Sequence, residues 1–134
     1  MVDTIKVTDA GMSIVTNRLK NSGTSPDYIH WGTGTTTAAN GNTALETASG
    51  HESRVQGTMT QQQTNVSNDT YQVVGTLTCA TSAKAITEAG LFDASTSGNL
   101  FLRGTFSAIN VNVDDSIEFT IKAAFDQAWT ERVN

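Results

Sequence analysis

Two segments in the second half of the chain alternate between apolar and polar residues. The alternation runs from Thr70 to Cys79 and again from Ser116 to Ala124. A β-strand places successive side chains on opposite faces of its sheet, so this period of two is typical of a strand with one buried face. The residues expected to face inward are Tyr71, Val73, Gly75, Leu77 and Cys79 in the first segment, and Ile117, Phe119, Ile121 and Ala123 in the second.

Four shorter segments are also predicted to form strands. They are Tyr28–Trp31, Glu52–Thr60, Ile86–Asp93 and Leu100–Phe106. The last two flank residues 94–99, a run of small and polar residues, and together they predict a hairpin. Strands separated by turn signals at this spacing predict an all-β protein, a single jelly-roll-like β-sandwich domain that spans residues 1–134.

One helix is predicted near the N-terminus, at about residues 8–21. Thr8 is suited to cap its first turn, and Met12, Val15 and Leu19 form one apolar stripe at helical spacing. The stripe is narrow, so we expect this helix to lie against a larger part of the structure. A C-terminal tail, at about residues 125–134, follows the last predicted strand.

Composition and charge exclude several classes of function. The net charge is −5, which argues against a nucleic-acid partner, because phosphate binding requires a basic surface. No segment approaches the length of about 20 apolar residues that crosses a bilayer, so no membrane partner is expected. The N-terminus lacks the features of a secretory signal, and we expect synthesis in a cytoplasm.

Candidate chemistry is sparse in this sequence. The histidines, His30 and His51, lie in separate segments, and the single cysteine, Cys79, is expected to be a small buried residue with no cation beside it. No catalytic, metal-binding or cofactor motif is present, so we expect a protein that is not an enzyme and has no cofactor. Glu88 lies among apolar residues and needs a partner, and Arg103 on the neighbouring strand is the candidate for a structural ion pair.

Large side chains without an obvious place in the sandwich are candidate interface residues. Trp129 and Phe125 follow the last strand, where a large aromatic residue belongs either to the core or to a contact with another subunit. Trp31 and Leu45 complete the set of candidates. The segments expected to bind a partner, outside the sandwich itself, are Val2–Val7, Thr33–Gly50 and Phe125–Asn134.

Four stretches give the chain a resemblance to small structural proteins of tailed bacteriophages. In order along the chain, they are Thr8–Met12 with Asn17–Leu19; Tyr28–Thr36 with Asn42–Glu46 and Arg54–Val55; Ile86–Asp93 with Gly98–Leu100 and Leu102–Arg103; and Phe106 and Ile109 leading into Asp115–Ile117. The most specific signal is the combination of Gly-Thr-Gly-Thr at residues 32–35 with Thr-Glu-Ala-Gly-Leu-Phe at residues 87–92.

The resemblance implies a virion protein without enzymatic activity. Proteins that look like this one include capsid decoration or cement proteins and tail-fibre or collar-like proteins. A fibre-base domain would normally continue into a shaft, whereas this sequence ends at Asn134. We therefore expect a decoration protein that binds the major capsid protein and stabilises the head.

Two alternatives stay open beside capsid decoration. One is a tail, collar or tail-fibre adaptor component, which would bind another virion protein. The other is a carbohydrate-binding module, for which Trp31 is the candidate stacking residue. For the virion roles, the resemblance also implies a homo-oligomer, and a trimer is expected.

Overall fold

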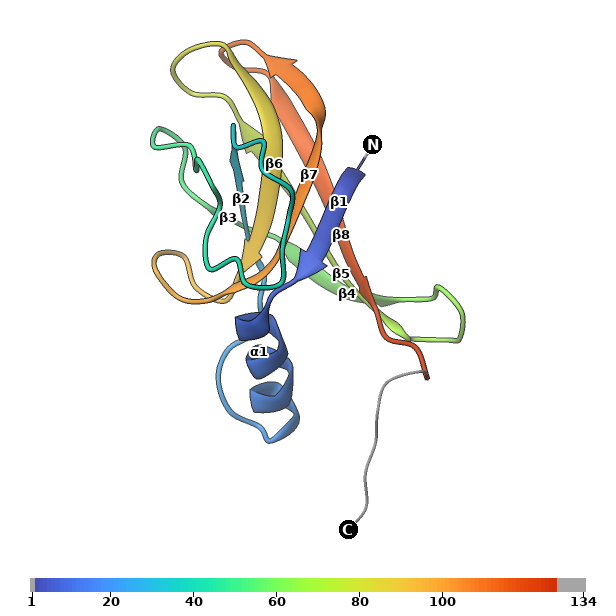
Figure 1. The fold of residues 1–134 in the computed structure, drawn as a ribbon. Helices are drawn as coiled ribbons and strands as arrows, with labels where there is room; N and C mark the ends of the chain where they lie inside the picture. The colour runs from blue at the N-terminus through green and yellow to red at the C-terminus, as the bar shows by residue number, and fades with distance from the viewer. Residues whose placement is uncertain (1, 128–134) are drawn as a thin grey trace.

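The computed structural model describes residues 2–127. Within this range the chain forms one helix and eight strands (Figure 1). The elements are β1 (Val2–Val7), α1 (Asp9–Leu19), β2 (Tyr28–Gly32), β3 (Val55–Gln56), β4 (Thr58–Gln62), β5 (Thr70–Thr78), β6 (Lys84–Phe92), β7 (Leu100–Val111) and β8 (Ser116–Ala124). No helix among these residues is long and apolar enough to cross a membrane.

The strands form two antiparallel sheets. The larger sheet has the order β1-β7-β6-β2-β3, and the smaller has the order β4-β5-β8. Side chains from both sheets share the main hydrophobic core, so the predicted β-sandwich is confirmed. In this core the ring of Trp31 from β2 meets the ring of Phe119 from β8 edge to face, with centroids 6.4 Å apart.

The predicted helix is confirmed, but the prediction of its buried face is wrong. The Gly11 amide donates to the Thr8 hydroxyl oxygen at 2.9 Å, as expected for the N-cap. Gly11 and Ile14 are the buried residues of α1, whereas Met12 and Leu19 are 57% and 75% exposed. A Cβ atom on Gly11 would lie 2.3 Å from the Phe101 carbonyl oxygen, so the helix contacts β7 closely through its glycine. Of the predicted stripe, only Val15 packs against the core, where it is partly buried.

The segment Glu52–Thr60, predicted as one strand, is divided between the two sheets. Its first part forms β3 in the larger sheet, and its second part forms β4 in the smaller sheet. The chain crosses at Gly57, where a Cβ atom would lie 2.4 Å from the Val73 side chain and 2.8 Å from the Val74 carbonyl oxygen. The chain can pass from β3 to β4 here because only a residue without a side chain fits so close to β5.

The predicted hairpin is present as β6 and β7, and β7 continues five residues beyond Phe106 to Val111. Arg54 supports the connecting loop, since its guanidinium donates to the carbonyl oxygens of Ala94 and Ser97 at 2.8 and 2.7 Å. The same guanidinium lies 3.6 Å from the centroid of the Phe92 ring. The loop is therefore attached to the β2–β3 side of the larger sheet.

The N-terminal segment Val2–Val7 is part of the sandwich, so the prediction that it lies outside is wrong. It forms β1, which pairs with β7 at one edge of the larger sheet. Unpaired backbone groups of β7 would otherwise be left at this edge, and β1 satisfies them. The backbone of Val2–Val7 is thus committed to the fold, and β1 leads directly into α1 (Figure 1).

Candidate functional site

Glu88 and Arg103 form an almost fully buried ion pair. Arg103 Nε donates to Glu88 Oε1 at 2.8 Å, and the two side chains are 1% and 0% exposed. Glu88 lies on β6 and Arg103 on the adjacent β7, two positions apart in register, because Glu88 pairs with Thr105 and Arg103 pairs with Gly90. An ion pair removed from water in this way requires further hydrogen bonds to offset its desolvation.

The long loop between β2 and β3 provides those hydrogen bonds to Glu88. The backbone amides of Gly34, Glu46 and Thr47 donate to its carboxylate at 2.9, 2.9 and 2.7 Å. Burial alone would raise the pKa of Glu88, but these amides and Arg103 together hold it below the usual value. The carboxylate therefore stays ionised and fastens the loop to the sheet.

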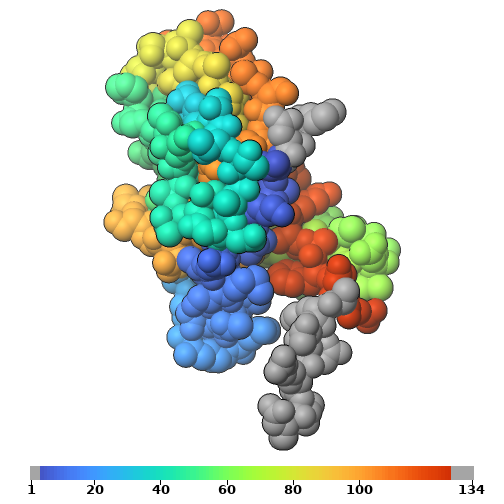
Figure 2. All heavy atoms as spheres, viewed as in Figure 1, coloured from blue at the N-terminus to red at the C-terminus, as the bar shows by residue number. Residues whose placement is uncertain are grey.

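Arg103 fastens the same loop from the other side of the ion pair. Its Nη2 atom donates to the Thr36 carbonyl oxygen at 3.0 Å, and its Nη1 atom donates to Asn42 Oδ1 at 3.2 Å. The loop, in teal, covers one face of the molecule in the space-filling view (Figure 2). The segment expected to be a free binding loop is thus an integral layer of the domain.

This contact accounts for the two motifs that were the most specific in the sequence. A Cβ atom on Gly32 would lie 2.2 Å from the Thr47 carbonyl oxygen, and one on Gly34 would lie 2.4 Å from Glu88 Oε2. The glycines let the loop come close to the buried carboxylate. The Gly-Thr-Gly-Thr and Thr-Glu-Ala-Gly-Leu-Phe stretches are therefore two halves of one structural unit.

A second polar cluster lies around Glu52. Its carboxylate accepts from Lys84 Nζ at 2.8 Å, from the Trp31 indole at 2.9 Å and from the Ala80 amide at 3.1 Å. The Ser49 hydroxyl also donates to it. Burial opposes ionisation, yet the Lys84 ammonium and the other donors lower the pKa of Glu52 to about 2.

The single cysteine belongs to the edge of this cluster. Cys79 is fully buried, as expected. The expectation that no cation lies beside it is wrong, since Lys84 Nζ is 3.4 Å from its sulfur atom. The lysine is five residues away in sequence, at the start of β6, and the short connection of residues 79–83 joins it to β5.

His30 is a buried residue of β2 and is 7% exposed. Its Nε2 atom lies 3.0 Å from the Ser49 carbonyl oxygen. Burial lowers its pKa, which favours the neutral imidazole. Among residues 2–127 there is no group of three or more His, Cys, Asp or Glu side chains that could bind a metal ion.

Two of the four predicted interface residues are buried within the chain. Trp31 is 0% exposed, and its indole is hydrogen-bonded to Glu52. Leu45 is 7% exposed and packs with Phe92 and Leu100. Trp31 belongs to the core between the sheets and Leu45 to a second apolar cluster, so neither side chain is exposed at the surface.

Of the two aromatic residues predicted in the tail, only Phe125 lies within the described part of the chain. Phe125 is 42% exposed, and its amide donates to the Asp69 carbonyl oxygen at 2.9 Å. It is thus a surface residue held at a defined position. Trp129 lies outside the described residues, as does the rest of the predicted tail from Ala128 onward.

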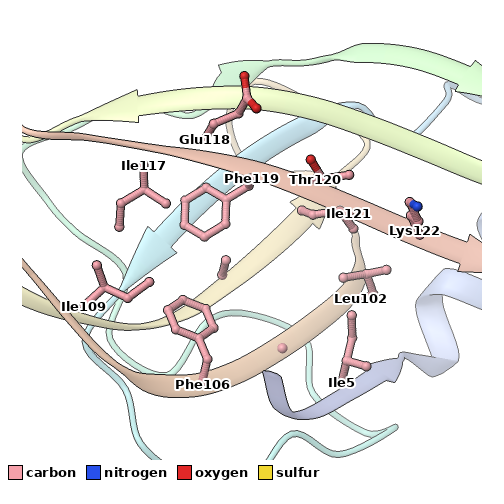
Figure 3. Close-up of a pocket in the computed structure, with 12 residues that line it drawn as sticks. Ile5, Leu102, Phe106, Ile109, Ile117, Glu118, Phe119, Thr120, Ile121 and Lys122 are labelled. Atoms are coloured by element: carbon pink, nitrogen blue, oxygen red, sulfur yellow. The ribbon is translucent and has the colours of Figure 1, made fainter. Parts of the chain in front are cut away.

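The exposed apolar side of the sandwich was not predicted from the sequence. It lies between β1 and β7 of one sheet and β8 of the other, and Figure 3 shows Phe106 and Phe119 facing each other across it. Their ring centroids are 6.1 Å apart. Ile5 and Ile109, which are 45% and 40% exposed, line the same hollow. Ile5 lies on β1 and Ile109 on β7. The residues next to them in the sequence do not distinguish them from isoleucines of the core.

Taken together, the buried polar groups hold loops in place, and the exposed hollow is apolar. Comparison with known proteins agrees with such a structural role. A family model described as Podophage GP4 fiber I protein gp80 matches residues 15–124, from within α1 to the end of β8. No curated protein and no solved structure matches the chain significantly. The chain is a structural protein of a phage virion and belongs to the family of the podophage GP4 fiber I protein gp80.

Proposed function

We propose that this protein is a component of the tail fibre of its phage, or of the adaptor that attaches the fibre to the tail. The observation that carries the proposal is the match of residues 15–124 to a family named for a fibre protein. The match covers the β2–β3 loop and every strand except β1, so it concerns most of the fold rather than a short motif.

We favour a tail, collar or tail-fibre adaptor component over a capsid decoration protein. The family match supports a fibre role at least as well as a role on the head. The expected partner accordingly becomes another tail protein instead of the major capsid protein. The buried Trp31 removes the one candidate stacking residue for a carbohydrate-binding module.

Association of copies of the chain, with a trimer as the expected form, is part of the proposal. The open side of the sandwich supports it, because Ile5 and Ile109 expose apolar surface beside the outer edge of β8. A symmetric assembly would cover this surface and the strand edge at the same time.

The position in the virion is tested by immunoelectron microscopy and by quantitative mass spectrometry of purified particles. A fibre component should be labelled at the tail and present in the small copy number that tail symmetry allows. An antibody against the major capsid protein provides the control for head labelling. Label over the whole head and hundreds of copies per particle would overturn the proposal in favour of decoration.

Assembly is tested with variants on the open side of the sandwich. Ile5→Asp and Ile109→Asp together should prevent incorporation into virions, because they place charges on the surface that a neighbouring copy covers. Met59→Asp is the matched control, since Met59 is 46% exposed but lies on β4, away from the open side. Equal incorporation of all variants would exclude this surface from assembly.

A further inference from the structure

The helix α1 carries an apolar face that the described residues leave uncovered. Met12 and Leu19 are separated by seven residues, so they lie on one face of the helix, with Val15 between them. Met12 is 57% exposed and Leu19 is 75% exposed, and both belong to the stripe that the sequence pattern marks as buried. An apolar stripe of this kind is typical of a helix face that packs against another segment.

The uncovered face forms one wall of a groove. Met12, Val15 and Leu19 line it together with residues at the end of β8 and just beyond, among them Lys122, Ala124 and Phe125. The groove has a volume of about 860 Å³. It is therefore large enough to receive an indole side chain together with part of a peptide backbone.

The position at which the chain leaves the groove indicates what fills it. Phe125 is fixed by its hydrogen bond to the Asp69 carbonyl oxygen, and both Phe125 and Asp126 line the groove. Residues 128–134 follow almost directly, with the sequence Ala-Trp-Thr-Glu-Arg-Val-Asn. Seven extended residues reach about 23–25 Å, whereas an 11-residue helix is only about 16 Å long. The segment can span the whole exposed face.

We propose that the C-terminal segment Ala128–Asn134 folds back over α1 of the same chain and that Trp129 occupies the groove. Trp129 is the one large aromatic residue in the segment, and its indole matches the many apolar side chains that line the groove. Attachment at Phe125 gives the segment a high effective concentration at the groove, which a separate chain does not have. The inference is independent of where the protein lies in the virion.

Intrinsic fluorescence tests this directly, because the chain has two tryptophans. In a Trp31→Phe variant, whose fold is checked by circular dichroism, all tryptophan emission comes from Trp129. We expect this emission at a shorter wavelength than that of N-acetyltryptophanamide, with severalfold weaker quenching by acrylamide. Emission and quenching equal to those of the reference compound would overturn the proposal.

Substitutions in the groove separate this site from burial elsewhere. In the Trp31→Phe background, Met12→Gln with Leu19→Gln should return the emission and the quenching to exposed values. Met59→Gln with Val66→Gln is the matched control, since these residues are 46% and 53% exposed and do not line the groove. An equal effect of both pairs, or no effect of either, would show that Trp129 lies elsewhere.

Dilution distinguishes the same chain from a second copy. The fluorescence of a segment docked on its own chain does not change with protein concentration while light scattering reports a monomer. Loss of the Trp129 signal on dilution, in parallel with dissociation of an oligomer, would assign the groove to a second copy and overturn the proposal.

Discussion

Arg103 Nε donates a hydrogen bond to Glu88 Oε1 at 2.8 Å, and these two almost fully buried side chains join the β6–β7 hairpin to the β2–β3 loop. Each partner bonds to the loop independently of the other: Glu88 through three backbone amides, and Arg103 through Thr36 and Asn42. The pair is thus the point at which three separate parts of the chain are held together.

Removal of either partner of this pair should strongly destabilise the protein. Glu88→Ala leaves a buried guanidinium without its counter-ion, and Arg103→Ala leaves a buried carboxylate, so each should lower the free energy of unfolding by about 3–5 kcal/mol. Urea denaturation measures the change, and the double variant should lose less than the sum of the two. Glu118→Ala, at an exposed position on β8, is the control. A loss below about 1 kcal/mol in both single variants would contradict the role assigned to the pair.

Glycine substitutions test how closely the loop packs on the sheet. Gly32→Ala brings a methyl group to 2.2 Å from the Thr47 carbonyl oxygen, so the loop must shift. We expect a loss of about 1–3 kcal/mol in thermal or urea unfolding. Gly41→Ala is the control in the β2–β3 loop, because nothing lies within 4 Å of its added methyl group, and it should be neutral or stabilise by up to about 1 kcal/mol. The opposite order of the two variants would refute this account.

The hairpin offers a comparison between two isoleucines that face each other across β6 and β7. Ile86 is 0% exposed, and its partner Ile109 is 40% exposed. Ile86→Ala should cost about 2–5 kcal/mol, because it leaves a cavity in the core. Ile109→Ala should change the stability of the isolated protein by only about 0.5 kcal/mol. Similar losses for both variants, measured by chemical denaturation, would show that Ile109 is part of the core.

Acid should destabilise the protein through the buried carboxylates. The pKa of Glu52 is about 2 in the folded protein, below its value in the unfolded chain, so the unfolded chain binds the proton more readily. The contribution of Glu52 is complete above about pH 5 and is lost as the pH falls towards 2. The lowered pKa values of Glu88 and His30 act in the same direction.

Unfolding by urea between pH 7 and pH 2 measures this dependence. The difference in free energy of unfolding between the wild type and Glu52→Gln should be constant above about pH 5 and shrink as the pH falls below that value. Glu118→Gln provides the control for an exposed carboxylate. A difference for Glu52→Gln that does not change with pH would show that its carboxylate is not held ionised by Lys84 and Ser49.

Several features of the fold follow from local patterns and could be predicted. The alternation in Thr70–Cys79 and Ser116–Ala124 corresponds to β5 and β8, because the period of side chains along a strand is independent of what the strand packs against. The need of Glu88 for a positively charged partner could also be predicted, because its neighbours in the sequence are apolar. A carboxylate among apolar residues requires a partner wherever the chain places it.

Other features depend on contacts between distant residues and carry no local signal. Gly57 takes the chain from one sheet to the other because Val73 and Val74 leave no room for a side chain. Trp31 has the same aromatic character in a core as on a surface, and its burial depends on Glu52 and on the loop above it. The exposed positions Ile5 and Ile109 likewise depend on how the two sheets open between β7 and β8.

The helix α1 has some features that are set by neighbouring residues and one that is set by a distant contact. Its existence, its start at Thr8 and its apolar stripe are determined by residues within one or two turns of each other, and the sequence alone determined them. Which face it turns towards the sandwich depends on the contact of Gly11 with the Phe101 carbonyl oxygen, about ninety residues further along the chain. Only the tertiary structure decided this, because a close approach between two backbones selects a glycine and leaves no periodic pattern in the sequence.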